Sequence, residues 1–159
     1  MRKLDSNDIA ILRTLQHEGR ITKAALAKAV NLSASPCWER LRRLEEDGFI
    51  TGYRAELDVR LIAPITEIIV EITLANHQGE DFKRFEDAIA SMPEVVECAA
   101  TGGGIDYIMK LVVRDVDAYQ RLMDRMLDDD LGIDRYFGYI VTKAVKSAPP
   151  DIRKLHEPI

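Results

Sequence analysis

The stretch from residue 33 to 43 combines small hydroxyls, an indole and several arginines, which suits contact with a nucleic acid. If its apolar residues face inward on the 3.6-residue period of a helix, four other side chains face outward: Ser35, Trp38, Glu39 and Arg42. An arginine fork can bind the edge of a guanine, and an apolar ring can pack on a thymine methyl group. A solvated charged face with Trp38 half-buried is the alternative interpretation.

Neighbouring polar residues are candidates for contacts to phosphate, which position a protein on DNA without reading its sequence. Arg40 and Arg43 point elsewhere on the helix, and either contact phosphate or pair with Glu45, Glu46 or Asp47. Tyr53 is a further phosphate candidate. The candidate DNA-binding residues are Thr22, Lys23, Ser33, Ser35, Trp38, Glu39, Arg40, Arg42, Arg43 and Arg54.

A second group with chemical potential is the glycine run at 102–104, followed by Asp106. Consecutive backbone N–H groups in such a turn can hold a carboxylate, and the Asp106 side chain could take an α-ammonium group. The alternative is a tight turn between strands in which Asp106 accepts backbone hydrogen bonds. Spacing alone favours the alternative.

The remaining polar residues show no pattern typical of an enzyme or a metal site. The three histidines are scattered, without metal-ligand spacing. No Ser-His-Asp, Cys-His or phosphate-loop motif is present. The acidic run 128–130 is interpreted as a solvated helix end. We therefore expect no enzymatic activity, no metal and no cofactor other than a small-molecule effector.

The first 58 residues predict three helices and a wing. Asp5 caps the first helix, Gly19 ends it, and Thr22 caps the second. Ser33 or Ser35 caps the third, whose buried stripe is Cys37, Leu41 and Leu44 and which ends at Gly48. Gly52 separates two β-prone runs in residues 49–58, which predicts a small hairpin. Two short helices around a tight turn, with a third before them, are typical of a helix-turn-helix.

The second half alternates between strand and helix patterns. Strands are predicted at 68–74, 95–101, 107–113 and 135–145, and amphipathic helices start near residues 82 and 116. The order β-α-β-β-α-β is the ferredoxin-like motif. The expected fold is α+β, with a winged helix-turn-helix domain at 1–58, a linker at 59–66, a ferredoxin-like sensing and oligomerisation domain at 67–147 and a tail at 148–159.

One detail of the predicted sheet concerns assembly. Helices of this fold cover only one face, yet Ile69, Ile108 and Val112 fall on the other face. An antiparallel sheet with one face in water should be polar there. Apolar residues on both faces predict that a second copy of the chain covers the free face.

Charge and composition agree with two domains of different roles. The net charge of −5 divides into +2 for residues 1–60 and −7 for residues 61–159, so the acidic half repels DNA and the basic half can approach it. No apolar run reaches the roughly 18 residues of a membrane span. Cys37 and Cys98 are expected to be reduced and buried, which suits the cytoplasm.

Several motifs together resemble one family. The chain is similar to the leucine-responsive/asparagine-regulator (Lrp/AsnC) family of bacterial and archaeal transcription factors, over nearly its whole length up to about residue 146. The motifs that carry the resemblance are Leu4-Asp5-x-x-Asp8-x-x-Ile11-Leu12, Gly19-Arg20-Ile21, Leu32-Ser33-Ala34-Ser35-Pro36-Cys37, Arg40-Leu41-x-x-Leu44-Glu45-x-x-Gly48-x-Ile50 and Gly103-x-x-Asp106-Tyr107.

The resemblance implies dimers that form through the sheets and often join into octamers. It also implies a small molecule, usually an amino acid, bound between dimers near the glycine turn. It thereby favours the ligand interpretation of that turn, with ligand-binding residues Gly102, Gly103, Gly104, Asp106, Tyr107, Tyr136 and Gly138. Gly102 stands where many members have Thr, and Gly138-Tyr139 stands where many have small hydroxyl residues, so the effector is expected to differ from leucine.

The leading hypothesis is a DNA-binding transcription regulator that responds to a small amino acid or a derivative of one. It is expected to bind a double-stranded operator, to form a homodimer or octamer, and to control a neighbouring amino-acid metabolism operon. A fainter resemblance, to regulators that accompany ectoine breakdown, adds a candidate effector pathway. The alternatives are an oligomeric DNA-binding protein with no effector response, and an enzyme, since ferredoxin-like domains host many chemistries.

Overall fold

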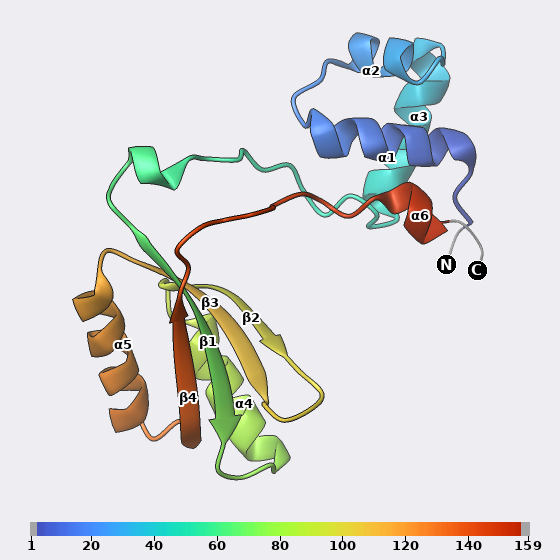
Figure 1. Ribbon diagram of the computed structural model, residues 1–159. Coiled ribbons are helices and arrows are strands. Elements are labelled where there is room, and N and C mark those ends of the chain that lie inside the picture. The colour runs from blue at the N-terminus through green and yellow to red at the C-terminus, as the bar shows by residue number, and fades with distance from the viewer. Residues whose placement is uncertain (1–2, 157–159) are drawn as a thin grey trace. The chain divides into compact units, whose positions relative to one another are not determined.

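The computed structural model describes residues 3–156 and divides the chain into two compact units (Figure 1). The first unit contains the chain up to Leu57 together with the segment from Lys146 onward, and the second runs from Asp58 to Val145. Among the helices of the described chain, none combines the length and apolar character that crossing a bilayer requires.

Three helices form the body of the first unit: α1 (Ser6–His17), α2 (Lys23–Ala29) and α3 (Ala34–Glu46). The Asp5 side chain accepts hydrogen bonds from the N–H groups of Asn7 and Asp8, and the Asp5 N–H donates to the Asp8 side chain. Together these bonds make a complete capping box. Thr22 caps α2 through the N–H of Ala25 at 3.2 Å. Ser33 occupies the cap position of α3, but its side chain makes no capping bond.

The end of α3 is set by Gly48, whose φ of 76° belongs to the left-handed region. The Gly48 N–H donates to the Glu45 carbonyl, and the Phe49 N–H donates to the Leu44 carbonyl at 2.9 Å. This is a Schellman motif, and it turns the chain so that Phe49 packs on the helical core. The predicted inner stripe of α3 is confirmed: Cys37, Leu41 and Leu44 are all buried.

The predicted hairpin at 49–58 was wrong. Residues 51–58 run without strand pairing into a short 3-10 helix, η1 (Val59–Leu61). Phe49 and Ile50 pack on the core, but every residue from 51 to 58 is exposed. An isolated pair of short strands with no buried face is marginal in water. The Tyr53 hydroxyl instead donates to Glu45 at 2.8 Å and holds the segment against α3.

The C-terminal segment packs on this same unit. Helix α6 (Ile152–His156) lies against α1, and the Gln16 side-chain amide donates to the Pro150 carbonyl at 3.4 Å. Ile152 lines a hollow of about 250 Å³ together with Leu12, Leu15 and other residues of α1 and the 49–53 segment. The sequence pattern had marked these residues only as a tail.

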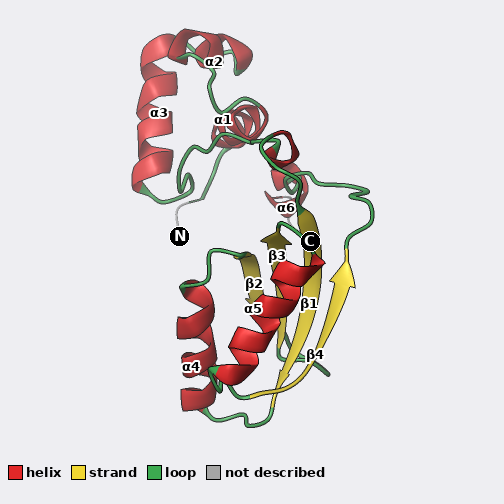
Figure 2. Cartoon of the chain, turned by 90° about the vertical axis from the view of Figure 1, so that its left-hand side faces the viewer, coloured by secondary structure: helices red, strands yellow, loops and turns green. Residues whose placement is uncertain are grey.

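The second unit has the predicted ferredoxin-like order: β1 (Thr66–Leu74), α4 (Gly79–Ala90), β2 (Val95–Ala100), β3 (Tyr107–Val113), α5 (Val116–Asp128) and β4 (Ile133–Ile140). All strand pairs are antiparallel, in the order β2-β3-β1-β4. Both helices cover one face of the sheet (Figure 2). The last strand ends at Ile140, five residues earlier than predicted.

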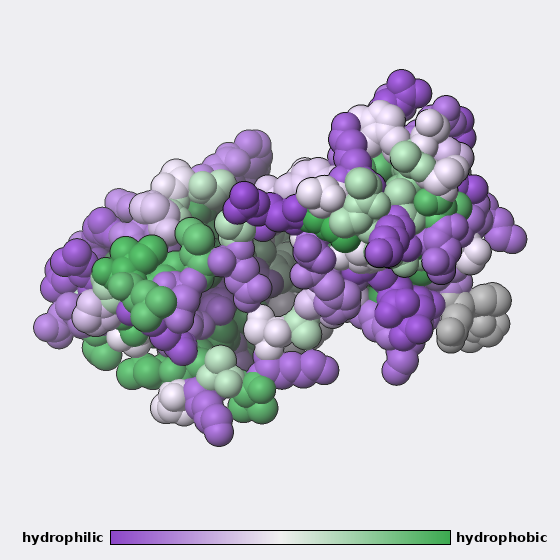
Figure 3. Space-filling model, turned by 90° about the horizontal axis from the view of Figure 1, so that it is seen from above, coloured by the Kyte–Doolittle hydropathy of each residue, from purple (hydrophilic) through white to green (hydrophobic). Residues whose placement is uncertain are grey.

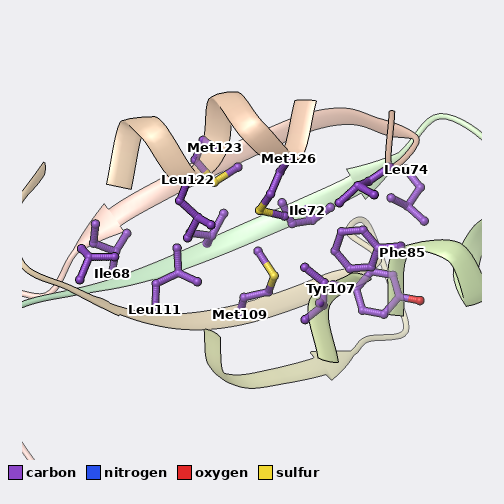
Figure 4. Packing of buried hydrophobic residues seen from close by; sticks show 14 residues of the cluster. Ile68, Ile72, Leu74, Phe85, Tyr107, Met109, Leu111, Leu122, Met123 and Met126 are labelled. Carbon is purple, nitrogen blue, oxygen red and sulfur yellow. The ribbon is translucent and has the colours of Figure 1, made fainter. Parts of the chain in front are cut away.

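The core of this unit lies between the sheet and its two helices (Figure 4). Alternate residues of β1 enter it, and the helices add Phe85, Met123 and Met126, each fully buried. Apolar side chains also lie open on the surface of the unit (Figure 3). Leu61 and Ile62, for example, are 85% and 75% exposed.

The prediction that both cysteines are buried was correct for only one of them. Cys37 is buried in the helical core, and burial raises the pKa of its thiol. Cys98 is exposed, contrary to the prediction. It lies on β2, which is an edge strand of the sheet, so neighbouring strands shield it on one side only.

Candidate DNA-reading surface and ligand-binding turn

The outer face of α3 is open, as its period predicts. Ser35, Glu39 and Arg42 are exposed, and Trp38 is 40% exposed despite its size. Two loose ion pairs run along the helix, from Arg42 to Glu46 at 3.6 Å and from Arg43 to Glu39 at 4.0 Å. Surface pairs of this kind contribute little stability, so both guanidinium groups can leave them for a phosphate or a base at small cost.

Arg40 has a different role from its neighbours. One guanidinium nitrogen donates to Asp5 at 2.6 Å and to Asp8 at 2.8 Å, and the Asp8 side chain is only 1% exposed. The backbone N–H of Asp8, and then Arg40, hold the pKa of Asp5 below its ordinary value, while the two carboxylates raise the pKa of Arg40. Arg40 therefore fastens the start of α1 to α3, and its partners are not the acids at 45–47 that the sequence suggested.

The remaining DNA-binding candidates lie around α3 in the same unit. Lys23 begins α2 and places its ammonium nitrogen 3.1 Å from the centre of the Trp38 ring. Thr22 uses its hydroxyl to cap α2, and Ser33 lies exposed at the start of α3. Arg54 is exposed in the segment after α3. These residues all belong to the unit that carries the helix-turn-helix.

Two hydrogen bonds of Thr101 close the turn at 101–106. The Thr101 hydroxyl donates to the Ile105 carbonyl at 2.7 Å, and the Thr101 N–H donates to the Asp106 carbonyl at 2.8 Å. The Gly102, Gly103 and Gly104 backbones are exposed between these two bonds, and Gly103 has a φ of 145° that only glycine adopts readily. The turn thus presents bare backbone to solvent.

Asp106 connects this turn to the end of β1. Its carboxylate accepts the Leu74 N–H at 2.8 Å, and the His77 ring nitrogen Nε2 lies 3.1 and 3.2 Å from its two oxygens. The backbone-accepting role, one of the two interpretations from sequence, is therefore present in the structure. His77 was not identified as a site residue, because its 29-residue separation from Asp106 gives no local signal.

A shallow pocket of about 360 Å³ opens beside the turn, lined by Phe82, Glu86, Ala100, Thr101, Asp106 and Tyr107. Its buried wall is Tyr107, whose ring packs on Phe85 with a centroid distance of 4.6 Å (Figure 4). The Tyr107 hydroxyl donates to Glu86 at 2.8 Å. Burial, and then this carboxylate, raise the pKa of Tyr107.

Tyr136 and Gly138, the other two candidate ligand residues, do not line this pocket. They lie on β4, and in the sheet register Ile72 of β1 stands between Tyr107 and Tyr136. Gly138 faces α5, where an added Cβ would collide with the Tyr119 hydroxyl. Within one chain the pocket is therefore lined by Asp106 and Tyr107 but by neither of the two candidates on β4. No cluster able to hold a metal ion occurs within residues 3–156.

Comparisons with known proteins agree with this organisation. Residues 4–51 match a family model described as winged helix-turn-helix DNA-binding, and residues 67–151 match one described as the Lrp/AsnC ligand binding domain. The chain is 53% identical over 144 residues to the transcriptional regulatory protein DoeX of Halomonas elongata, covering 91% of each chain.

Two solved structures share the fold over nearly the whole length. An AsnC family transcriptional regulator from Agrobacterium tumefaciens has a TM-score of 0.86 and 35% identity, covering 92% of this chain and 95% of that one. A transcriptional regulator of Neisseria meningitidis in complex with L-Met has a TM-score of 0.85 and 29% identity, covering 91% and 94%. These matches describe transcription regulators, not enzymes, and the chain belongs to the Lrp/AsnC family of DNA-binding transcription regulators with a ligand-binding domain.

Proposed function

We propose that this protein binds a specific DNA operator through α3 and that a small amino acid, or a derivative of one, changes its assembly or its affinity for DNA. The operon that it controls is then an amino-acid metabolism operon beside its own gene. The observation that carries the proposal is the pairing, in one chain, of an open α3 face with a separate unit that holds a glycine turn and a pocket.

The DNA contacts of this proposal divide into two classes. Ser35, Trp38, Glu39 and Arg42 reach base edges from the outer face of α3. Thr22, Ser33, Arg43 and Arg54 surround that face and contact phosphate. Lys23 lies in the same region, with its ammonium nitrogen over the Trp38 ring. Arg40 supports the surface indirectly, since its bonds to Asp5 and Asp8 fix α3 against α1.

The effector in this proposal is a zwitterion held at residues 102–106. The exposed backbone N–H groups of the three glycines bind its carboxylate. Its ammonium group lies near Asp106 and Glu86, the two carboxylates of the pocket wall. The Neisseria regulator with L-Met, which has the same fold, supports an amino acid as the ligand class.

Assembly is the third part of the proposal. Ile108 is 39% exposed on the sheet face that no helix covers, and Phe137 and Tyr139 of β4, on the same face, are about half exposed. A second copy of the chain covers this face, and such dimers join into octamers with Tyr136 and Gly138 near the effector of a neighbouring subunit. A dimer carries two helix-turn-helix units, which suits a palindromic operator.

The test uses DNA that the parent protein selects from a randomised duplex library. Mobility shift and light scattering then follow a screen of amino acids, their derivatives and ectoine-pathway compounds. Asp106→Asn keeps an oxygen for the Leu74 N–H but removes the charge, so it should abolish the effector response and leave ligand-free DNA binding intact. Asp134→Asn, an exposed change on β4, is the matched control.

Two outcomes would contradict parts of the proposal. A full response by Asp106→Asn would place the effector elsewhere. Selective DNA binding by the parent with no response to any compound would favour the alternative, an oligomeric DNA-binding protein without an effector. Absence of selective DNA binding by the parent would overturn the proposal as a whole.

A further inference from the structure

Trp38 is the only tryptophan of the chain, and it lies where a large aromatic ring is least expected, on the open face of a helix. Indole rings usually bury most of their area, and their N–H finds a partner when they do. Trp38 keeps 40% of its surface in solvent. Its exposed neighbours on the helix, Glu39 and Arg42, are the charged groups expected in a DNA groove.

The side chain of Lys23 contacts one face of the Trp38 ring. The ammonium nitrogen of Lys23 lies 3.1 Å from the ring centroid, well within the range of a cation–π interaction. Among the residues that the structure describes, no salt bridge is found between Lys23 and a carboxylate, so the indole is its identified partner. One face of the ring is therefore occupied by a cation from α2, which favours one orientation of the ring on α3.

We propose that Trp38 reads a base, by apolar contact with a thymine methyl group, and that Lys23 is a positioning residue that sets the plane of the indole for this contact. The inference rests on the proposed DNA-binding function and adds a specificity determinant to it. Lys23 lies at the first residue of α2 and Trp38 near the start of α3, so the pair joins the two helices of the motif at its reading surface.

The proposed role of Lys23 in orienting Trp38 predicts a result that a phosphate contact does not predict. A lysine that only binds phosphate strengthens binding to all sequences alike and adds to the salt dependence. A lysine that orients Trp38 changes preference at the base pair that Trp38 meets, and has no such effect once the ring is gone. The two roles therefore separate in a double-mutant cycle.

The experiment measures affinity for the duplex selected by the parent protein and for the same duplex with each base pair replaced. Trp38→Leu should lose roughly fivefold or more of the discrimination at one base pair, the usual range for a single mismatch. Lys23→Gln should lose roughly two- to fivefold at the same base pair. Lys23→Arg, which keeps a cation over the ring, should retain the parent's discrimination at that base pair.

The matched control is Lys28→Gln, which removes the same charge from the other end of α2, where the side chain is exposed. It should leave discrimination unchanged. In the Trp38→Leu background, Lys23→Gln should have no further effect on discrimination. Because Trp38 is the single tryptophan, its fluorescence gives a reading without DNA: acrylamide should quench it more in Lys23→Gln than in the parent or in Lys23→Arg.

Other results would overturn the inference. Equal weakening of all duplexes by Lys23→Gln, with a smaller salt slope and additivity with Trp38→Leu, would reduce Lys23 to a phosphate contact. Unchanged discrimination in both Trp38→Leu and Trp38→Phe, each with the parent's unfolding midpoint, would remove Trp38 from base reading. In both cases the parent still binds its duplex selectively, so the failure is distinct from failure of the proposed function.

Discussion

The two faces of the sheet are built from alternate residues of the same strands, yet they differ in kind. On the covered face, Ile68, Val70 and Ile72 of β1 are fully buried beneath the helices, and no charge interrupts them. On the free face, apolar and charged residues share the same rows. Ile108 and Phe137, for example, flank Glu71 in the register.

Two carboxylates of the free face, Glu67 and Glu71, already have partners within the chain. Glu67 bonds to Lys110 at 2.9 Å and to Arg60 at 2.8 Å, and the Tyr139 hydroxyl donates to Glu71 at 3.3 Å. A partner that covered this face would therefore bury Glu67 as a neutralised pair and Glu71 as a hydrogen-bonded carboxylate, which is less costly than burying bare charges. The covered face therefore serves only to stabilise the fold, while the free face can either contact water or be covered by a partner.

The largest expected effect comes from breaking the covered face. Phe85→Ala removes a fully buried ring against Tyr107 and should lower the free energy of unfolding by about 3–5 kcal/mol, measured by urea denaturation. Phe137→Ala is the same change on the free face at a half-exposed ring, and should cost about 0.5 kcal/mol or less in the isolated chain. Equal losses would refute the contrast between the faces.

A smaller effect is expected where the covered face has no room. In Gly138→Ala the new Cβ collides with the hydroxyl of Tyr119 and lies 2.8 Å from its Cζ, so the ring must move. Overpacking of this kind costs about 1–3 kcal/mol. Tyr119→Phe in the same background removes the colliding oxygen and should recover part of the loss in thermal unfolding. No recovery would mean that the ring is not the obstacle.

The free face should respond through association instead. Ile108→Lys places a charge on the surface that a second copy would cover, and should weaken dimerisation about tenfold, a change of about 1.4 kcal/mol. Sedimentation equilibrium measures this directly. Leu127→Lys adds the same charge at an exposed position of α5 and should leave the dimer intact. A parent that is monomeric at micromolar concentration would contradict the whole assembly argument.

The smallest effect concerns the pairs of the free face. Lys110, followed by Arg60, lowers the pKa of Glu67. A carboxyl with a lowered pKa in the folded state adds stability above its unfolded-state pKa and loses it as the pH falls through the folded-state pKa. Glu67→Gln should therefore cost about 0.2–1 kcal/mol at pH 7 and nothing at low pH. Urea denaturation at the two pH values measures this, and an equal loss at low pH would mean that the charge of Glu67 does not stabilise the fold.

Much of the fold was predictable because its signals are local. The caps at Asp5 and Thr22, the inner stripe of α3 and the end at Gly48 each depend on residues within one or two turns of each other. The predicted hairpin at 49–58 was wrong because its strands depend on a surface to pack against, which local residues do not reveal. β-propensity describes fit to a half-buried surface, and the second unit holds the only paired strands in the described chain.

The sequence by itself determined the three helices that form the body of the first unit, the strands and helices of the second, their order and the family, because period, caps and motifs are properties of nearby residues. Only the tertiary structure decided which polar groups meet. The bonds of Arg40 to Asp5 and Asp8, of His77 to Asp106 and of Gln16 to Pro150 join residues that are 29 to 134 positions apart. Such contacts depend on how the packed elements bring distant side chains together, and no local pattern records that.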